Sequence, residues 1–337
     1  MQEVILITGA NGEVGHALIP ELAKSKNVVA ITLDINELDD TLKPFAHEVV
    51  IADILDSSII DNLLTKHSVG TVFHLASILS TGGEKNPERA HQVNVDGTNA
   101  LLSSVNRVAT QEKRAIKFIF PSSIAAYGLP DLETKKKIQR VKEGQYATPI
   151  TMYGVNKLYC ELLGVYYSKY YKLLEPRPEG VLLDFRCLRF PGIISALTLP
   201  TGGTSDYAPE MIHSAAKGQG YESFVRPDTA IPFMVMPDAI KALVGLTNAP
   251  KEKLTQEVYN VSAFSATAED IAKLVNNVFP DSSISYKPDL NRQKIVDSWP
   301  TDIDDSKARS DWSWKPDYDI NSAFKNYLIP EIRNKYK

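Results

Sequence analysis

The chain has 337 residues but only two cysteines, Cys160 and Cys187, and no metal-ligand spacing surrounds either of them. So few cysteines exclude a disulfide-stapled secreted scaffold and a cysteine-rich metal site. We therefore expect two buried thiols, no metal ion and a reducing, cytoplasmic setting.

Long apolar runs and a strong net charge are also lacking. No apolar stretch is long enough to cross a bilayer, and the first residues, with an apolar strand at 4–7, resemble neither a secretory signal nor a transit peptide. The formal net charge is -4, so the chain lacks the excess of positive charge that is typical of nucleic-acid-binding proteins. These absences predict no membrane and no nucleic acid among its partners, and the length fits one large or two modest domains.

A glycine-rich loop follows the first predicted strand. Gly9, Gly12 and Gly15 are spaced as G-x-x-G-x-x-G and precede a helical apolar pattern at 17–23. Glycines at such a turn let a pyrophosphate approach the N-terminus of the helix. The loop predicts a dinucleotide cradle, with contacts from Gly9, Asn11, Gly12, Glu13 and Val14.

An acidic residue ends the second predicted strand. Asp34 lies 19 residues beyond Gly15, where a carboxylate accepts hydrogen bonds from the adenosine ribose and repels a 2′-phosphate. The sequence therefore favours NAD over NADP. A third strand at 48–52 ends at Asp53 and Ile54, which we expect to contact the adenine. Asp53 as the N-cap of the next helix is an equally good interpretation.

Two further predicted strands end in small residues or serines. The strand at 71–75 ends at Leu75 and Ala76, which suit close approach to a cofactor, and we interpret His74 as a core histidine. Asn94, at the start of a predicted helix, is expected to be an internal brace. The strand at 118–120 is followed by Ser122 and Ser123, and ligands of open α/β folds bind at such strand ends.

Tyr153 and Lys157 are four residues apart and would share one face of a helix. A neighbouring ammonium favours the ionised form of a phenol, so this pair can make a proton acceptor. Alone, such a pair is usually a surface contact. Its place after a nucleotide cradle and a serine-ended strand favours chemistry.

These motifs, in this order and spacing, resemble the extended short-chain dehydrogenase/reductases over nearly the whole chain. The resemblance implies that Ser123 orients the reacting oxygen and that Tyr153 is the acid/base. It also implies that Lys157 holds the ribose and lowers the pKa of the tyrosine, while Ser122 could share or replace the role of Ser123. Pro191 and Ile193 match the segment that contacts the nicotinamide in this superfamily.

The C-terminal half is similar to the short-chain L-threonine 3-dehydrogenases. The similarity is carried by segments at 202–208, 227–234, 298–300 and 304–312. It implies oxidation of the C3 hydroxyl of L-threonine to 2-amino-3-oxobutyrate with NAD. The candidate substrate contacts are Ser80, Ser122, Ser123, Tyr153, Thr204 and Trp299.

Two features depart from that similarity. The loop 173–180 is longer than usual, which suggests a surface insertion. Phe233 follows Pro232 where the family pattern has methionine, and it could touch the wall of the substrate pocket.

Alternating strand and helix patterns predict an α/β fold, with a Rossmann-type doubly wound parallel sheet and a smaller C-terminal substrate-binding lobe. We assign residues 1–194, with about 231–262, to the NAD-binding domain. Residues of about 195–230 and 263–337 are assigned to the lobe.

Two other functions stay open at this point. A nucleotide-sugar 4-epimerase or dehydratase shares the cradle and the Tyr/Lys pair and would need arginines for a diphosphate, for which Arg226, Arg292 and Arg309 are available. A redox-sensing binding protein would keep the NAD fold without chemistry, but it has no need of Ser123, Tyr153 and Lys157.

The superfamily resemblance also implies a homodimer that pairs through the Tyr/Lys helix. Apolar residues on that helix are consistent with pairing, and a core-facing stripe explains them equally well. They are Leu158, Leu162, Leu163 and Val165.

Overall fold

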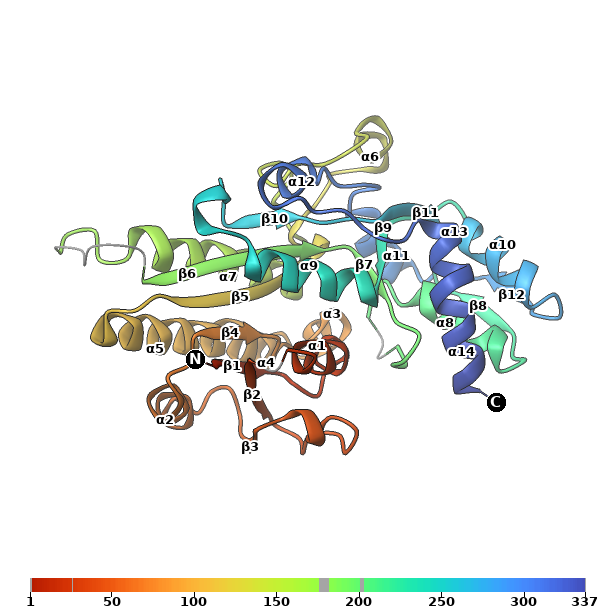
Figure 1. Cartoon of the computed structure of the whole chain (residues 1–337). Coiled ribbons are helices and arrows are strands. Elements are labelled where there is room, and N and C mark those ends of the chain that lie inside the picture. Colours follow the sequence, from red (N-terminus) through yellow and green to blue (C-terminus); the bar gives the residue numbers. More distant parts are fainter. Residues whose placement is uncertain (1, 26, 176–181, 201–202, 337) are drawn as a thin grey trace.

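A seven-stranded sheet in the order β10-β6-β5-β4-β1-β2-β3 organises the computed structural model, which describes residues 2–25, 27–175, 182–200 and 203–336 (Figure 1). All neighbouring strands run parallel. The strands are β1 (Glu3–Thr8), β2 (Val28–Asp34), β3 (Glu48–Ile51), β4 (Thr71–His74), β5 (Ile116–Ser123), β6 (Leu183–Phe190) and β10 (Val258–Asn260). The parallel sheet confirms the predicted fold class.

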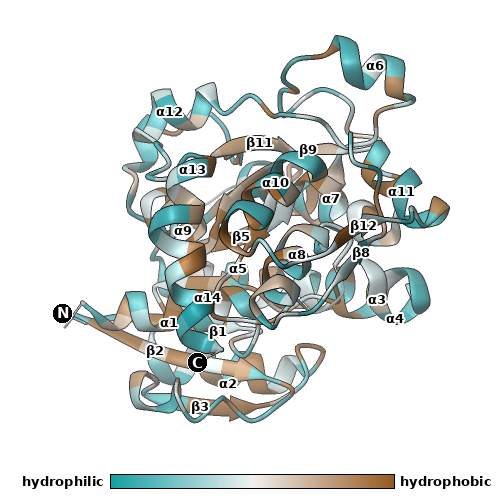
Figure 2. Cartoon of the chain, turned by 90° about the vertical axis from the view of Figure 1, so that its right-hand side faces the viewer, coloured by the Kyte–Doolittle hydropathy of each residue, from teal (hydrophilic) through white to brown (hydrophobic). Residues whose placement is uncertain are grey.

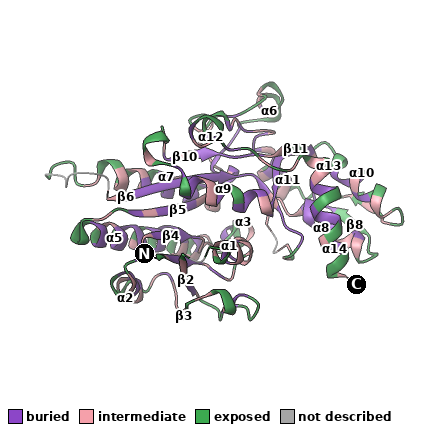
Figure 3. Cartoon of the chain, viewed as in Figure 1, coloured by how far each residue is buried: buried purple, intermediate pink, exposed green. Residues whose placement is uncertain are grey.

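Helices cover both faces of this sheet, as a doubly wound fold requires. One apolar core joins the sheet to α1 (Glu13–Ala23) and α9 (Met236–Asn248). A second core joins it to α2 (Ser57–His67), α5 (Gly97–Glu112) and α7 (Met152–Val165). Because both faces are covered, β5 and β6 are almost entirely buried, and exposed residues gather on the outer helices (Figure 3).

A smaller C-terminal part lies beyond the carboxyl ends of the strands, to the right in Figure 1. It contains the sheet β11-β9-β7 and the pair β12-β8. Its elements are β7 (Gly192–Ile194), α8 (Tyr207–Ala216), β8 (Tyr221–Ser223), β9 (Ala230–Val235), β11 (Phe264–Thr267), α10 (Ala268–Val278), β12 (Ile284–Tyr286), α11 (Leu290–Asp297), α13 (Ile320–Ala323) and α14 (Ile329–Lys335). The chain returns to the large sheet through α9 and β10, and the proposed domain boundaries stay a prediction.

Short elements complete the chain. They are η1 (Lys43–Phe45), α3 (Ser80–Lys85), α4 (Pro87–His91), η2 (Gln92–Asp96), η3 (Ile124–Ala126), α6 (Leu132–Lys137), η4 (Tyr166–Tyr170), η5 (Lys251–Lys253), α12 (Ser306–Trp312) and η6 (Phe324–Leu328). In Figure 2, β2 is largely hydrophobic, whereas α6 and α12 at the periphery are largely hydrophilic.

One predicted helix start is wrong. Asn94 does not open a helix, because the helical run already begins at Pro87, and Asn94 lies in the π turn η2 between α4 and α5. Its predicted role as a brace is confirmed. The side chain accepts from the backbone N–H of Ile78 at 2.7 Å and donates to the Ile78 carbonyl at 3.0 Å.

Both cysteines are buried and free, as predicted. Within the described ranges, no helix is long and apolar enough to span a membrane.

The close packing of α7 on β6 gives a testable prediction. An added Cβ at Gly164 would lie 2.2 Å from the buried ring of Phe185. Gly164→Ala should therefore lower the free energy of unfolding by roughly 2 kcal/mol through overpacking, measured by denaturant titration. Gly144→Ala is the control, because a Cβ at Gly144 meets no atom within 4 Å. Equal stabilities of the two variants would contradict this account of the helix packing.

Candidate active site

A cleft of about 430 Å³ lies between the carboxyl ends of the central strands and the C-terminal part. Its walls come from the glycine loop, the end of β5, the first turns of α7 and the segment after β6. The other side is formed by residues 198–199 and 203–206 and by Trp299. This is the place where open parallel sheets bind their ligands.

The glycine loop has the backbone that a dinucleotide requires. Gly9 has a φ of +67°, and a Cβ there would lie 2.4 Å from the backbone nitrogen of Ala76. Helix α1 starts after Gly12, whose N-cap position makes no side-chain hydrogen bond. The N–H groups of the first turn are therefore not capped by that residue, which fits a pyrophosphate at this helix N-terminus.

Asp34 is held beside this loop. Its carboxylate accepts from the backbone N–H groups of Asn11 and Asn36, each at 3.0 Å. A carboxylate has about four acceptor sites, so it keeps capacity for two ribose hydroxyls. The side-chain oxygen of Asn11 accepts from the backbone of Asp39, which fixes the loop further.

Asp53 does not cap the next helix, so that alternative interpretation is wrong. Asp56 is the N-cap of α2 and accepts from the backbone of Ser58 and Ile59. Asp53 instead accepts from the Arg89 guanidinium at 2.7 Å and from the backbone N–H of Leu55. Together with Ile54, which is buried, it lies outside the lining of the cleft, and a contact of either residue with adenine stays a prediction.

Ser123, Tyr153 and Lys157 come together at the floor of the cleft. The Ser123 hydroxyl lies near enough to the Tyr153 phenol to lower its pKa, and it also accepts from the backbone N–H of Ala125 at 3.1 Å. The Lys157 ammonium lies 5.6 Å from the centre of the Tyr153 ring and donates to the Pro121 carbonyl at 2.8 Å. Thr151 caps α7 by accepting from the backbone of Gly154, which fixes where the helix and its tyrosine begin.

Burial opposes ionisation of both groups. It raises the pKa of Tyr153 to about 12, and the Ser123 contact acts in the opposite direction. It lowers the pKa of Lys157 to about 8, so the ammonium still predominates at neutral pH. The phenol therefore needs further positive charge nearby before it is a useful base near neutral pH.

Ser122 also lines the cleft, but its hydroxyl is engaged by Glu161. This hydroxyl donates to the buried Glu161 carboxylate at 2.5 Å, whereas Ser123 contacts the phenol. Of the two serines left open by the sequence, Ser123 is the one whose hydroxyl lowers the pKa of the Tyr153 phenol.

The other candidate substrate contacts line the cleft. Thr204 donates to the Ser80 hydroxyl at 2.9 Å, so the two residues join the C-terminal part to the start of α3. Trp299 is 4% exposed and belongs both to the cleft wall and to the apolar core of the C-terminal part. Leu75, Pro191 and the remaining glycine-loop residues also line it, while Ala76 does not appear in the lining.

Sequence reasoning missed Asp206. It lines the cleft opposite the glycine loop, and its charge adds to burial in raising the pKa of Glu13 to about 7. The two acidic residues come from segments almost 200 positions apart. In the sequence, the only sign that Asp206 lies in the cleft is that it is the acidic residue of the 202–208 segment.

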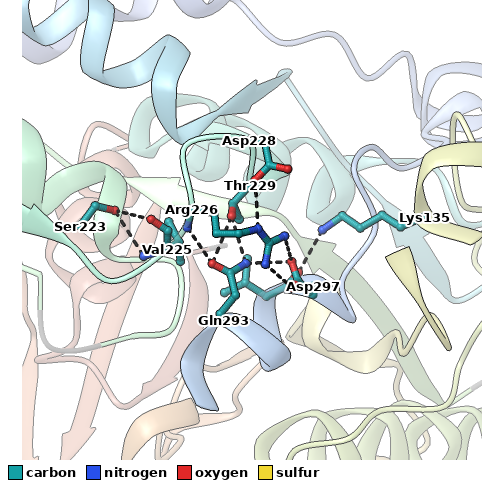
Figure 4. A network of polar contacts seen from close by, with 9 residues as sticks. Lys135, Ser223, Val225, Arg226, Asp228, Thr229, Gln293 and Asp297 are labelled. Atoms are coloured by element: carbon teal, nitrogen blue, oxygen red, sulfur yellow. Dashed lines mark hydrogen bonds and ion pairs between the residues drawn. The ribbon is translucent and has the colours of Figure 1, made fainter. Parts of the chain in front are cut away.

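A second, larger cleft of about 680 Å³ lies between the segment 128–150 and α11. Its main polar groups are already paired (Figure 4). Arg226 binds Asp297 through two nitrogens, at 2.9 and 3.0 Å, and Asp228 through a third. Gln293 also donates to Asp297, so this network holds the C-terminal part together rather than facing a ligand.

The other arginines considered for a diphosphate are also engaged. Arg292 donates to the Gly203 carbonyl and stacks on Phe224, and Arg309 binds Asp305 through two nitrogens.

Comparison with known proteins agrees with this geometry. Residues 5–262 match the model of the NAD dependent epimerase/dehydratase family. The chain belongs to this family. The mitochondrial L-threonine 3-dehydrogenase of Bos taurus is 37% identical over 334 residues, which cover 95% of this chain and 80% of the relative.

Solved structures show the same similarity. The L-threonine dehydrogenase of Clostridium difficile has a TM-score of 0.85 at 34% identity and 99% coverage of both chains. The holo form of the Cupriavidus necator L-threonine dehydrogenase has a TM-score of 0.83 at 32% identity, covering 98% of this chain and 99% of its own. The predicted similarity to short-chain L-threonine 3-dehydrogenases is confirmed.

Of the two departures from that family pattern, the structure places Phe233 outside the lining of the cleft. Phe233 is fully buried and does not line the cleft; a Cβ at Gly192 would lie 2.7 Å from its ring, so it supports the cleft wall from behind. Of the 173–180 insertion, residues 176–180 lie outside the described residues.

The environment of Glu13 gives a pH-dependent prediction. Its pKa is raised from 4.5 to about 7 in the fold, so the folded state favours the proton and loses stability as the pH rises from about 5 to 7. Glu13→Gln removes the ionisation and should stabilise the protein by roughly 2 kcal/mol more at pH 8 than at pH 5. Urea titrations at both pH values measure this difference. The exposed Glu133→Gln should show none, and a pH-independent effect of Glu13→Gln would contradict the assignment.

Proposed function

We propose that this protein oxidises the C3 hydroxyl of L-threonine to 2-amino-3-oxobutyrate with NAD. The observation that carries the proposal is the convergence of Ser123, Tyr153 and Lys157 at the floor of one cleft, next to the glycine loop. The similarity to threonine dehydrogenases over almost the whole chain supports threonine as the substrate.

Each residue of this cluster has a distinct task. Tyr153 removes the proton from the C3 hydroxyl, and Ser123 orients that oxygen by hydrogen bonding. Lys157 holds the ribose and, as a cation, lowers the pKa of the phenol. Bound NAD would supply the hydride acceptor and a positive charge beside the phenol. The glycine loop and Asp34 would hold its pyrophosphate and ribose.

Carboxylates in the cleft suit an amino acid. The ammonium of threonine needs an anionic partner, and Asp206 supplies it. Ser80 and Thr204 offer hydroxyls to the substrate carboxylate. Trp299 closes the apolar side of the cleft.

The rival functions fit the residues less well. A nucleotide-sugar epimerase must bind a diphosphate, but Arg226 and Arg309 are paired with Asp297 and Asp305. Arg292 donates to the Gly203 carbonyl and stacks on Phe224, and its buried Nε has no partner among the described residues. A sensor without chemistry does not need the serine, tyrosine and lysine together.

The test is NADH formation by the purified protein with NAD and, in separate assays, L-threonine, L-serine and a UDP-sugar. We expect threonine-dependent NADH, and Tyr153→Phe should lower its rate roughly 10²-fold or more while NAD binding, followed by calorimetry, stays nearly unchanged. Sugar conversion without net NADH would favour the epimerase. A wild-type rate in Tyr153→Phe would refute the role of the tyrosine.

We also propose a homodimer formed through α7. The inward face of this helix carries Lys157 and Glu161, whereas an apolar stripe at helical spacing remains exposed. The stripe comprises Val155, Tyr159, Leu162, Tyr166 and Tyr170, each between 42% and 64% exposed. Of the residues named from the sequence, Leu163 packs into the core and Leu162 is exposed. The helix therefore has one apolar face for the core and a second that is available for pairing.

Light scattering measures the mass of the protein in solution. We expect the mass of a dimer for the wild type and of a monomer for Leu162→Glu. In a symmetric interface both protomers would bury the new glutamate, and two unpaired like charges would destabilise the dimer. Leu290→Glu, at a more exposed site on α11, should remain dimeric. A monomeric wild type would exclude this pairing.

A further inference from the structure

A buried carboxylate lies directly behind the Ser123, Tyr153 and Lys157 cluster. Glu161 is 2% exposed and lies on α7, one turn beyond Lys157. It accepts from the Ser122 hydroxyl at 2.5 Å and from two nitrogens of Arg189 at 2.8 and 2.6 Å. Glu161 thereby links α7 to β5 and β6.

Arg189 extends this link to the segment that leads into α7. It donates to the backbone carbonyl of Glu143 at 2.8 Å, and its guanidinium lies 4.7 Å from the centre of the Tyr127 ring. In the sheet register, Arg189 lies directly opposite Ser122. The contact therefore reaches both chain segments that deliver Ser123 and Tyr153 to the cleft.

The strand geometry makes this contact relevant to the chemistry. Neighbouring side chains of a strand point to opposite faces, so a hydroxyl anchored at Ser122 sets the direction in which Ser123 points. We propose that Glu161, held by Arg189, is a positioning residue that anchors Ser122 and so presents Ser123 to the Tyr153 phenol. This inference rests on the proposed roles of Ser123 and Tyr153.

A purely structural role for the ion pair is the alternative. Removing either charge leaves the other buried without a partner and strongly destabilises a fold, so substitutions of Glu161 or Arg189 do not separate the two roles. Ser122→Ala does separate them. It deletes one hydroxyl and leaves the Glu161–Arg189 pair and every charge in place.

Loss of the anchor should weaken the contact between Ser123 and Tyr153. That contact lowers the pKa of the phenol, so weakening it should raise this pKa. The acid limb of the pH profile of kcat for threonine oxidation should then move to higher pH. We expect a shift of about one unit, which lowers kcat roughly tenfold at pH 7, with KM changed much less. The charged or titratable groups around Tyr153 and Lys157 include His74, Cys160, Glu161, Cys187 and Arg189. Glu84, which accepts from the Met152 N–H, and His91, which contacts Asn156, also face the start of α7. Ser122→Ala alters the charge of none of them.

Two matched variants complete the series. Ser122→Thr keeps the hydroxyl and should keep most of the wild-type profile. Asp184→Asn disrupts a second buried ion pair, with Arg186, at the other end of β6. It should lower stability without moving the acid limb. Equal profiles for the Ala and Thr variants, or a wild-type limb in Ser122→Ala, would overturn the proposal.

A second readout does not need the substrate. Tyrosine labelled with ¹³C at the ring carbon that bears the hydroxyl reports ionisation of the phenol by NMR in the NAD-bound protein, and Tyr153→Phe identifies the signal. The signal should titrate at higher pH in Ser122→Ala than in the wild type or Asp184→Asn. If the wild type forms no NADH with threonine, the proposed function fails, and this titration still decides whether Ser122 controls Tyr153.

Discussion

The rest of the site depends on how the buried ammonium of Lys157 is stabilised. A charged group inside a fold must be compensated, and three elements contribute here. The Pro121 carbonyl accepts a hydrogen bond at 2.8 Å, the Phe120 ring lies 4.6 Å from the ammonium, and Glu161 lies one turn along α7. The parallel sheet makes this possible, because it brings the end of β5 against the start of α7.

The cleft contains side chains of both charge signs. Its floor carries the Lys157 ammonium, whereas Glu13 and Asp206 bring two carboxylates together at the glycine loop and the C-terminal part. Two nearby acids raise each other's cost of ionisation, and a bound ammonium relieves it. The Glu13 and Asp206 pair also couples the C-terminal part to the glycine loop by charge.

Several features were open to sequence reasoning because they depend on local spacing. The glycine loop with Asp34 and the Tyr153/Lys157 pair follow from strand and helix periodicity, and the structure brings the loop and the pair to one cleft. Errors arose where the local signal was ambiguous. Asp53 and Asp56 are both plausible caps, and only the helix start decides for Asp56. Asn94 looked like a helix start because a π turn has no distinct residue pattern.

By itself, the sequence determined the parallel α/β fold, the glycine loop after the first strand and the placing of Tyr153 and Lys157 on one helix, since each depends on short-range spacing. The tertiary structure alone decided which serine meets Tyr153, because Ser122 and Ser123 are chemically identical and differ only in the face of β5 from which they point. It alone brought Asp206 to Glu13 and Arg189 to Glu161. These contacts join residues far apart in the chain, and packing rather than periodicity sets them.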